Sequence, residues 1–95
     1  MAELDPHLQQ PARLRLMTML TAASTVEFTT LRDYLDVSDS VLSKHIAALA
    51  SVDYVKSRKG VYEGRRTTWI ALTATGRAAL GTHVRALRDI IANVP

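Results

Sequence analysis

The order of segments between residues 29 and 73 constrains the fold of this chain more than any other feature. The spacing of apolar and β-forming residues there predicts a short helix, a tight turn, a second helix and a two-stranded hairpin. The predicted segments are helices at 30–36 and 39–49, strands at 54–59 and 67–73, and a loop at 60–66. This order predicts a mainly α fold with a small antiparallel β hairpin.

Helix-start signals organise the rest of the chain. A hydroxyl at the N-cap accepts a backbone N–H, and proline suits the first helical position because its missing N–H needs no partner there. The expected starts are Pro11 for a helix at 11–24, Thr30 (with Asp33 as a capping box) for 30–36, Ser38 for 39–49 and Thr73 for 74–92. Residues 26–28 form a candidate third strand. We expect residues 1–10 to be irregular, with Asp5-Pro6 favouring a turn or a helix start.

The chain is short and lacks cysteine, and both facts limit how it is stabilised. Its 95 residues suffice for a single domain over residues 1–95, which is marginal as a lone monomer. Because neither a disulfide nor a cysteine-based zinc site is available, a partner subunit is the remaining common route to stability. No apolar run is long enough to span a bilayer and no signal-peptide pattern opens the chain, so we expect a cytoplasmic protein.

Positive charge is concentrated in one segment. Residues 56–66 carry five basic side chains against one acidic side chain, although the whole chain has a formal net charge of only +3. A local excess of this kind is typical of a surface that contacts a polyanion. The alternative is a solvated strand edge on which lysines prevent edge-to-edge pairing.

The exposed face predicted for the helix at 39–49 has almost no long or charged side chains, and we call it the bare face. It carries small or hydroxylic residues, including Ser40 and Ser43, and the single cation Lys44. Such a face can approach another molecule closely, and serine and lysine donate to base edges and phosphates in a DNA major groove. An ordinary solvent-exposed face is the alternative, although such a face more often carries several Glu/Lys pairs.

Four segments resemble the winged helix-turn-helix regulators of the MarR/ArsR type, and particularly their short stand-alone group. Residues 11–17 resemble the opening helix, 41–49 the recognition helix, 54–56 the start of the wing, and 64–77 the wing exit with its "LT..GR" helix start. Asp53 stands where the family has a glycine. The resemblance implies a homodimeric, sequence-specific, double-stranded-DNA-binding transcriptional regulator whose outer helices form the dimer interface.

The candidate DNA contacts lie on the two predicted helices and on the hairpin. Arg65 and Arg66 are expected in the loop at the wing tip, where arginine can enter a minor groove. The front of the helix at 30–36 is expected to bind phosphate, because a helix N-terminus attracts anions. The full set is Thr30, Arg32, Ser38, Ser40, Ser43, Lys44, Arg58, Lys59, Arg65 and Arg66.

An apolar seam on the last helix is the candidate dimer interface. Leu80, Val84, Leu87 and Ile91 recur at coiled-coil-like spacing, and Leu14 and Met17 add a second apolar surface. The alternative is that these residues cover the core of their own chain. Because the apolar surface exceeds what one small core needs, the sequence favours a dimer.

The remaining functional classes receive little support. There is no nucleophile elbow, P-loop or glycine-rich dinucleotide turn, so we expect neither an enzyme nor a cofactor. His7 and His83 could meet Asp5 or Asp89 in a dimer, but no ligand spacing supports a metal site. If a small-molecule effector regulates the chain, we expect its pocket between the dimer helices and the DNA-binding core, but the sequence does not identify that molecule. The alternatives are a winged helix for protein–protein interaction, favoured by the near-neutral body, and an RNA-binding protein, for which Tyr62 is the sole candidate stacking residue in the loop.

Overall fold

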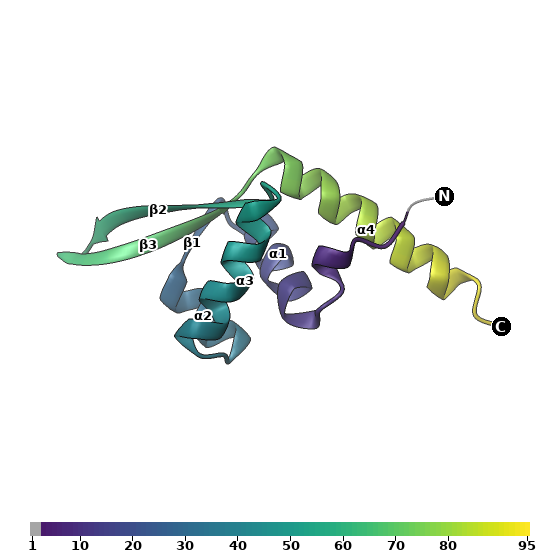
Figure 1. Ribbon diagram of the computed structural model, residues 1–95, viewed down its shortest axis with the longest axis horizontal. Helices are drawn as coiled ribbons and strands as arrows, with labels where there is room; N and C mark the ends of the chain where they lie inside the picture. The colour runs from purple at the N-terminus through teal and green to yellow at the C-terminus, as the bar shows by residue number, and fades with distance from the viewer. Residues whose placement is uncertain (1–2) are drawn as a thin grey trace.

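The computed structural model describes residues 3–95. The elements are η1 (Pro6–Leu8, a 3-10 helix), α1 (Pro11–Ala22), β1 (Thr25–Glu27), α2 (Phe28–Leu35), α3 (Asp39–Ser51), β2 (Val55–Tyr62), β3 (Arg65–Leu72) and α4 (Ala74–Ala92). Helices α1 to α3 form a body from which the β2–β3 hairpin and α4 project in opposite directions (Figure 1). The molecule is therefore elongated, with extents of 54 × 25 × 22 Å. These elements confirm the expected winged helix-turn-helix.

The core lies among the three helices of the body and the root of the hairpin. Each helix contributes leucine side chains at helical spacing, and burying one such side chain stabilises the fold by about 1.5–3 kcal/mol. The fully buried leucines of these helices are Leu16, Leu20, Leu31, Leu42 and Leu49. Ile70 of β3 joins them, so the hairpin is anchored at its root while its far half has no helix beneath it.

The sheet has the strand order β1-β3-β2, and all of its pairings are antiparallel. Strands β2 and β3 pair over their whole length, from Val55 opposite Leu72 to Tyr62 opposite Arg65. The turn is only two residues long, with positive φ at Glu63 (51°) and Gly64 (76°), which is the signature of a type I′ hairpin. The strands therefore extend into the stretch where a loop was expected.

The start of α2 differs from the expectation. The helix begins at Phe28 and its N-cap is Glu27, which makes no side-chain cap. Thr30 therefore lies inside the first turn, and the predicted capping box is wrong. The cause is tertiary, because β1 pairs with β3 up to Glu27 and Phe28 packs against the core at once. The Ser38 cap is confirmed, since its Oγ accepts the backbone N–H of Val41 at 3.2 Å.

Asp53 ends α3 in the conformation that glycine usually supplies. Its φ is 62°, its N–H donates to Ala50 O at 3.0 Å, and the N–H of Tyr54 donates to Leu49 O at 2.9 Å. This pair of bonds is a Schellman motif, and aspartate tolerates left-handed backbone better than most residues do. The departure from the family's glycine therefore leaves the turn into the wing intact.

The first turn of α4 rests directly on the turn that ends α3. The Thr73 hydroxyl accepts the N–H of Gly76 at 2.9 Å and donates to Asp53 O at 2.5 Å, which confirms Thr73 as the cap. The backbone N–H of Thr73 donates to Tyr54 O at 3.1 Å. A Cβ at Gly76 would lie 2.1 Å from that same oxygen, so only glycine fits at this position.

Residues 3–10 pack against the body and include the helix start expected at Asp5-Pro6, although the segment as a whole was expected to be irregular; residues 1–2 lie outside the described residues. Asp5 caps the 3-10 helix η1, and Leu8 is fully buried in the core. The backbone N–H of Asp5 donates to Nδ1 of the buried His83 at 2.9 Å, which ties the segment to α4. Within residues 3–95, no helix combines the length and apolar character that crossing a bilayer requires.

Candidate nucleic-acid interface

Helix α3 presents the bare face that the sequence predicted. Ser40, Ser43, Lys44 and Ala47 are exposed, while the opposite face is buried in the core. Ser38 and Ser40 share a hydrogen bond of 3.2 Å between their hydroxyls at the start of the helix. No acidic side chain follows Asp39 on this helix, so Lys44 is not neutralised along its own face.

A contact from α1 holds α3 in place. Nε of Arg13 donates to Nδ1 of His45 at 3.1 Å. Partial burial, followed by the nearby charge of Arg13, lowers the pKa of His45 below its usual value. His45 is therefore neutral and accepts at Nδ1, and this contact orients the recognition helix on the body.

Arg32 occupies a different place from the one expected. It lies in the last turn of α2, and its guanidinium pairs with Asp39 at 3.0 Å and with Asp33 at 3.1 Å. Its bonds to Asp39 and then Asp33 raise its pKa. Arg32 thus links α2 to the start of α3, and its charge is already offset by two carboxylates. Thr30 remains exposed on the first turn of α2.

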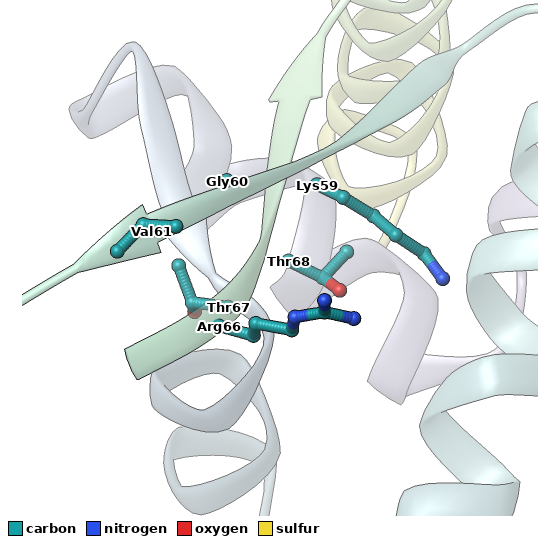
Figure 2. A pocket seen from close by; sticks show the side chains of 6 residues that line it. All are labelled: Lys59, Gly60, Val61, Arg66, Thr67 and Thr68. Carbon is teal, nitrogen blue, oxygen red and sulfur yellow. The ribbon is translucent and has the colours of Figure 1, made fainter. Parts of the chain in front are cut away.

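The hairpin divides its basic side chains between two faces. Alternate residues of a strand point to opposite faces, so Lys59 and Arg66 share the face that carries Ile70 toward the body. Figure 2 shows these two side chains extending to the same side from neighbouring strands, around a hollow of about 370 Å³. Arg58 and Arg65 lie on the opposite face. Arg65 and Arg66 belong to β3, so their predicted location in a loop is wrong.

A second hollow, of about 350 Å³, separates α3 from the root of the hairpin. Its lining is small, hydroxylic or apolar, and contains no charged side chain: Phe28, Ser43, Ile46, Ala47, Ala50, Ser57, Thr68 and Ile70. Ser57 and Thr68 were not among the predicted contacts. Strand alternation could have identified both residues, because it places each of them on the same face of the hairpin as Ile70.

The predicted dimer residues separate into two groups. Met17 is fully buried and Leu80 is 7% exposed within this one chain, so both serve the chain's own core. Leu14, Val84 and Leu87 are partly exposed, and Ile91 is 68% exposed. The surface that a partner can reach therefore lies toward the C-terminal end of α4.

Three residues that the sequence placed far apart meet at the N-terminal segment. The Tyr54 phenol donates to Asp5 Oδ2 at 2.5 Å, and this bond, reinforced by partial burial, raises the pKa of Tyr54 to about 12. Asp5 also bonds to His83 through its backbone, as described above. Within residues 3–95, no group of three or more His, Cys, Asp or Glu side chains is arranged to hold a metal ion.

A helix-turn-helix with a bare second helix beside a cationic hairpin defines the winged-helix class of nucleic-acid-binding proteins. Residues 12–91 match the family described as "Winged helix DNA-binding domain", and the chain belongs to that family. It is a family of DNA-binding transcription regulators, not of enzymes.

Similar proteins agree with this assignment. The uncharacterized protein MJ0432 of Methanocaldococcus jannaschii is 27% identical over 82 residues, which cover 86% of this chain and 89% of that protein. The transcriptional regulator homologue of Pyrococcus horikoshii OT3 has a similar structure, with a TM-score of 0.84 and 26% identity over 90% of this chain and 85% of the other. Sco3205, a MarR family regulator from Streptomyces coelicolor solved in complex with DNA, shares the fold, with a TM-score of 0.72, 22% identity and coverage of 96% and 64%. The resemblance to winged helix-turn-helix regulators is therefore confirmed, and the likeness to Sco3205 shows the shared fold.

Proposed function

We propose that this chain is a single-domain, sequence-specific transcriptional regulator that binds an inverted-repeat operator in double-stranded DNA as a cytoplasmic homodimer. The observation that carries the proposal is the continuous surface formed by the bare face of α3, the uncharged hollow beside it, and Lys59 and Arg66 on the adjoining face of the hairpin. Every charged side chain on the exposed part of that surface beyond Asp39 is basic.

The shape of the surface matches the grooves of B-DNA. A recognition helix occupies a major groove, and a wing reaches the neighbouring minor groove. One sugar–phosphate strand separates those two grooves, so it must pass between α3 and the hairpin. The hollow at that place is lined by Ser43, Ser57 and Thr68, whose hydroxyls can donate to phosphate without repelling it.

The individual contacts follow from these positions. Lys44 and Ser43 are the proposed base-reading residues, with Ser40 and the capping Ser38 at the N-terminal end of the helix. Arg66 and Lys59 are proposed to contact the phosphates of the strand beside the hollow. Arg65 and Arg58 lie on the opposite face of the hairpin, so they are not included in this duplex contact. Thr30 is a proposed phosphate contact, and Arg32 is proposed to support the site by bridging α2 to α3.

The proposed dimer uses the exposed end of α4. Ile90, Ile91 and Val94 are 52%, 68% and 67% exposed, and Val84 and Leu87 continue the apolar surface toward the body. Pairing these surfaces in two copies would remove them from water and set two recognition helices at a fixed spacing. Ile91→Glu should therefore yield a monomer in sedimentation equilibrium while leaving the circular dichroism spectrum unchanged.

Selection from a randomised pool of duplexes, followed by affinity measurements across a salt series, tests the proposal. We expect a palindromic consensus. Lys44→Ala should relax the preference at one base position per half-site, with a loss of about 1–3 kcal/mol in discrimination. Arg66→Ala should lower affinity for all duplexes and make the log–log salt slope shallower by about 0.9 for each phosphate that the variant no longer neutralises.

Arg88→Ala is the matched control, because it removes one exposed positive charge from α4 instead of from the proposed surface. It should leave both specificity and salt slope unchanged. Binding without a consensus, equally weakened by Arg66→Ala and Arg88→Ala, would refute the proposal and favour the alternative of a protein-docking winged helix.

A further inference from the structure

The face of the hairpin turned away from the body carries most of the basic charge of the wing. Strand alternation places Lys56, Arg58 and Arg65 on this outer face, against Lys59 and Arg66 on the inner one. The three outer side chains are all exposed. A DNA-binding surface centred on α3 does not explain them, because they point to the other side of the sheet.

One acidic side chain of the sheet shares this outer face, because Glu27 of β1 is the register partner of Trp69. Glu27 of β1 accepts a hydrogen bond from the Thr67 hydroxyl at 2.8 Å, and Glu63 lies at the turn. Among residues 3–95, the ion pairs within 4.0 Å belong to Arg32 and not to any cation of the hairpin. Three cations against one carboxylate leave the outer face with an excess of positive charge, which an anionic partner would complement.

The same face carries an aromatic pair that the hairpin register brings together. Tyr62 and Trp69 lie seven positions apart in the chain, yet their ring centroids are 5.8 Å apart at an interplanar angle of 83°. The indole rests against the glycine of β2, where a Cβ on Gly60 would lie 3.3 Å from its Cδ1 and Nε1 atoms. Tyr62 is 43% exposed and Trp69 is partly exposed, so aromatic surface remains open to solvent.

A hollow of about 380 Å³ lies beside the indole. It is lined by residues of all three strands: Thr25, Lys56, Ser57, Arg58, Trp69 and Ala71. Its volume falls in the range of small-ligand sites, which is about 300–1,000 Å³. An aromatic wall with two cations at its rim suits a planar ring that is joined to an anionic group.

We propose that this outer face, which we call the Trp69 platform, binds single-stranded nucleic acid. An unpaired base would stack on the indole while its phosphates meet Lys56 and Arg58, the combination of aromatic platform and cationic track that single strands require. Duplex DNA does not fit this chemistry, since its bases are paired and stacked and cannot offer a free face to the indole. The platform is thus a second nucleic-acid surface, independent of α3.

The chain contains one tryptophan, so its fluorescence reports on this platform directly. Titration with an oligothymidine of about ten nucleotides should quench Trp69 emission in a saturable manner, because stacking on the indole accompanies binding. A labelled copy of the same oligomer, followed by fluorescence anisotropy, allows variants without the tryptophan to be compared. Trp69→Leu should weaken binding about tenfold or more, whereas Trp69→Phe should retain most of it.

Two charge-matched double variants separate the faces of the hairpin. Lys56→Ala/Arg58→Ala removes two cations from the Trp69 platform, and Lys59→Ala/Arg66→Ala removes two from the inner face. We expect the outer variant to lose single-strand affinity by about tenfold and to keep duplex affinity, with the reverse result for the inner variant. Circular dichroism confirms that both variants fold.

Four results would overturn the platform. They are an absence of quenching at low salt, equal loss of single-strand binding in both double variants, loss of duplex instead of single-strand binding in the outer variant, and a thymidine mononucleotide that binds as tightly as the oligomer. The last result would assign the hollow to a free nucleotide. Because the two surfaces are assayed with different ligands, failure of duplex recognition leaves this inference standing, and the converse also holds.

Discussion

Replacement of Gly76 by alanine tests the packing that joins α4 to the recognition helix. A Cβ at this position would lie 2.1 Å from the carbonyl oxygen of Tyr54, and 2.8 Å and 2.9 Å from two further backbone atoms of the same residue. Backbone atoms cannot rotate away as the end of a flexible side chain can. The start of α4 must therefore move, and with it the bond from Thr73 N–H to Tyr54 O.

The expected loss follows from these contacts. Overpacking costs about 1–3 kcal/mol, and the broken hydrogen bond about 0.5–1.5 kcal/mol. Alanine returns about 1 kcal/mol through its better helix propensity. The net destabilisation is therefore about 2 kcal/mol, or roughly 8–16 °C in Tm for a domain of this size.

Gly81→Ala is the matched control in the same helix. A Cβ there would meet only Nη1 of Arg85 at 3.6 Å, which is an ordinary contact. This variant should raise the free energy of unfolding by up to about 1 kcal/mol. Urea titrations followed by Trp69 fluorescence measure both variants at one protein concentration, since association would shift the midpoint. Equal stabilities for the two variants would refute the reasoning.

Three further predictions concern helix α3 and the turn that follows it. Ser38→Ala removes an N-cap acceptor and should lower the free energy of unfolding by about 1 kcal/mol in the same titration; no change would mean that the cap is dispensable. The pKa of Tyr54 is about 10 in the unfolded state, and the bond to Asp5 raises it to about 12 in the native state. The native state therefore holds the Tyr54 proton more tightly than the unfolded state does. This stabilisation is complete below about pH 10 and is lost as the pH rises toward 12, so Tyr54→Phe should lack that part of the alkaline decline; coinciding curves would contradict the assignment. His45 has a lowered native pKa, so its contribution is present above about pH 6.5 and is lost as the pH falls below it. His45→Gln, whose side-chain oxygen can still accept from Arg13, should show a flatter acid limb in unfolding measured against pH, and an unchanged limb would argue against this role.

Local signals predicted the elements whose causes are local. Ser38 and Thr73 were recognisable as caps because an N-cap depends on one hydroxyl and on the backbone N–H three residues further on. The position of the first turn of α2 depends instead on how β1 and Phe28 pack against the core. The predicted capping box at Thr30 therefore gave the wrong first residue for this helix. In that case tertiary packing overrode the local preference.

The hairpin shows how one missed turn alters a whole surface. Asn-Gly or Asp-Gly would have marked a two-residue turn, whereas Glu63-Gly64 carries a weaker signal. Without that turn the register is unknown, and with it the face to which each basic side chain points. The sequence therefore predicted a cationic wing, but it could not predict which basic side chains lie on each face. Nor could it predict the contact between Trp69 and Tyr62.

The junction at Gly76 also makes α4 a lever. The helix has 19 residues and, at 1.5 Å per residue, is about 28 Å long. One end is bonded to the turn that closes the recognition helix, and the other stands clear of the body (Figure 1). If α4 moves as a rigid rod, a small tilt at its anchored end displaces its free end by a larger distance. Conversely, a displacement of the free end rotates the anchored end, next to α3, by the same angle but moves it less. In the proposed dimer, the distance between the two recognition helices would therefore depend on how the two α4 helices meet, even if neither domain changed its internal structure.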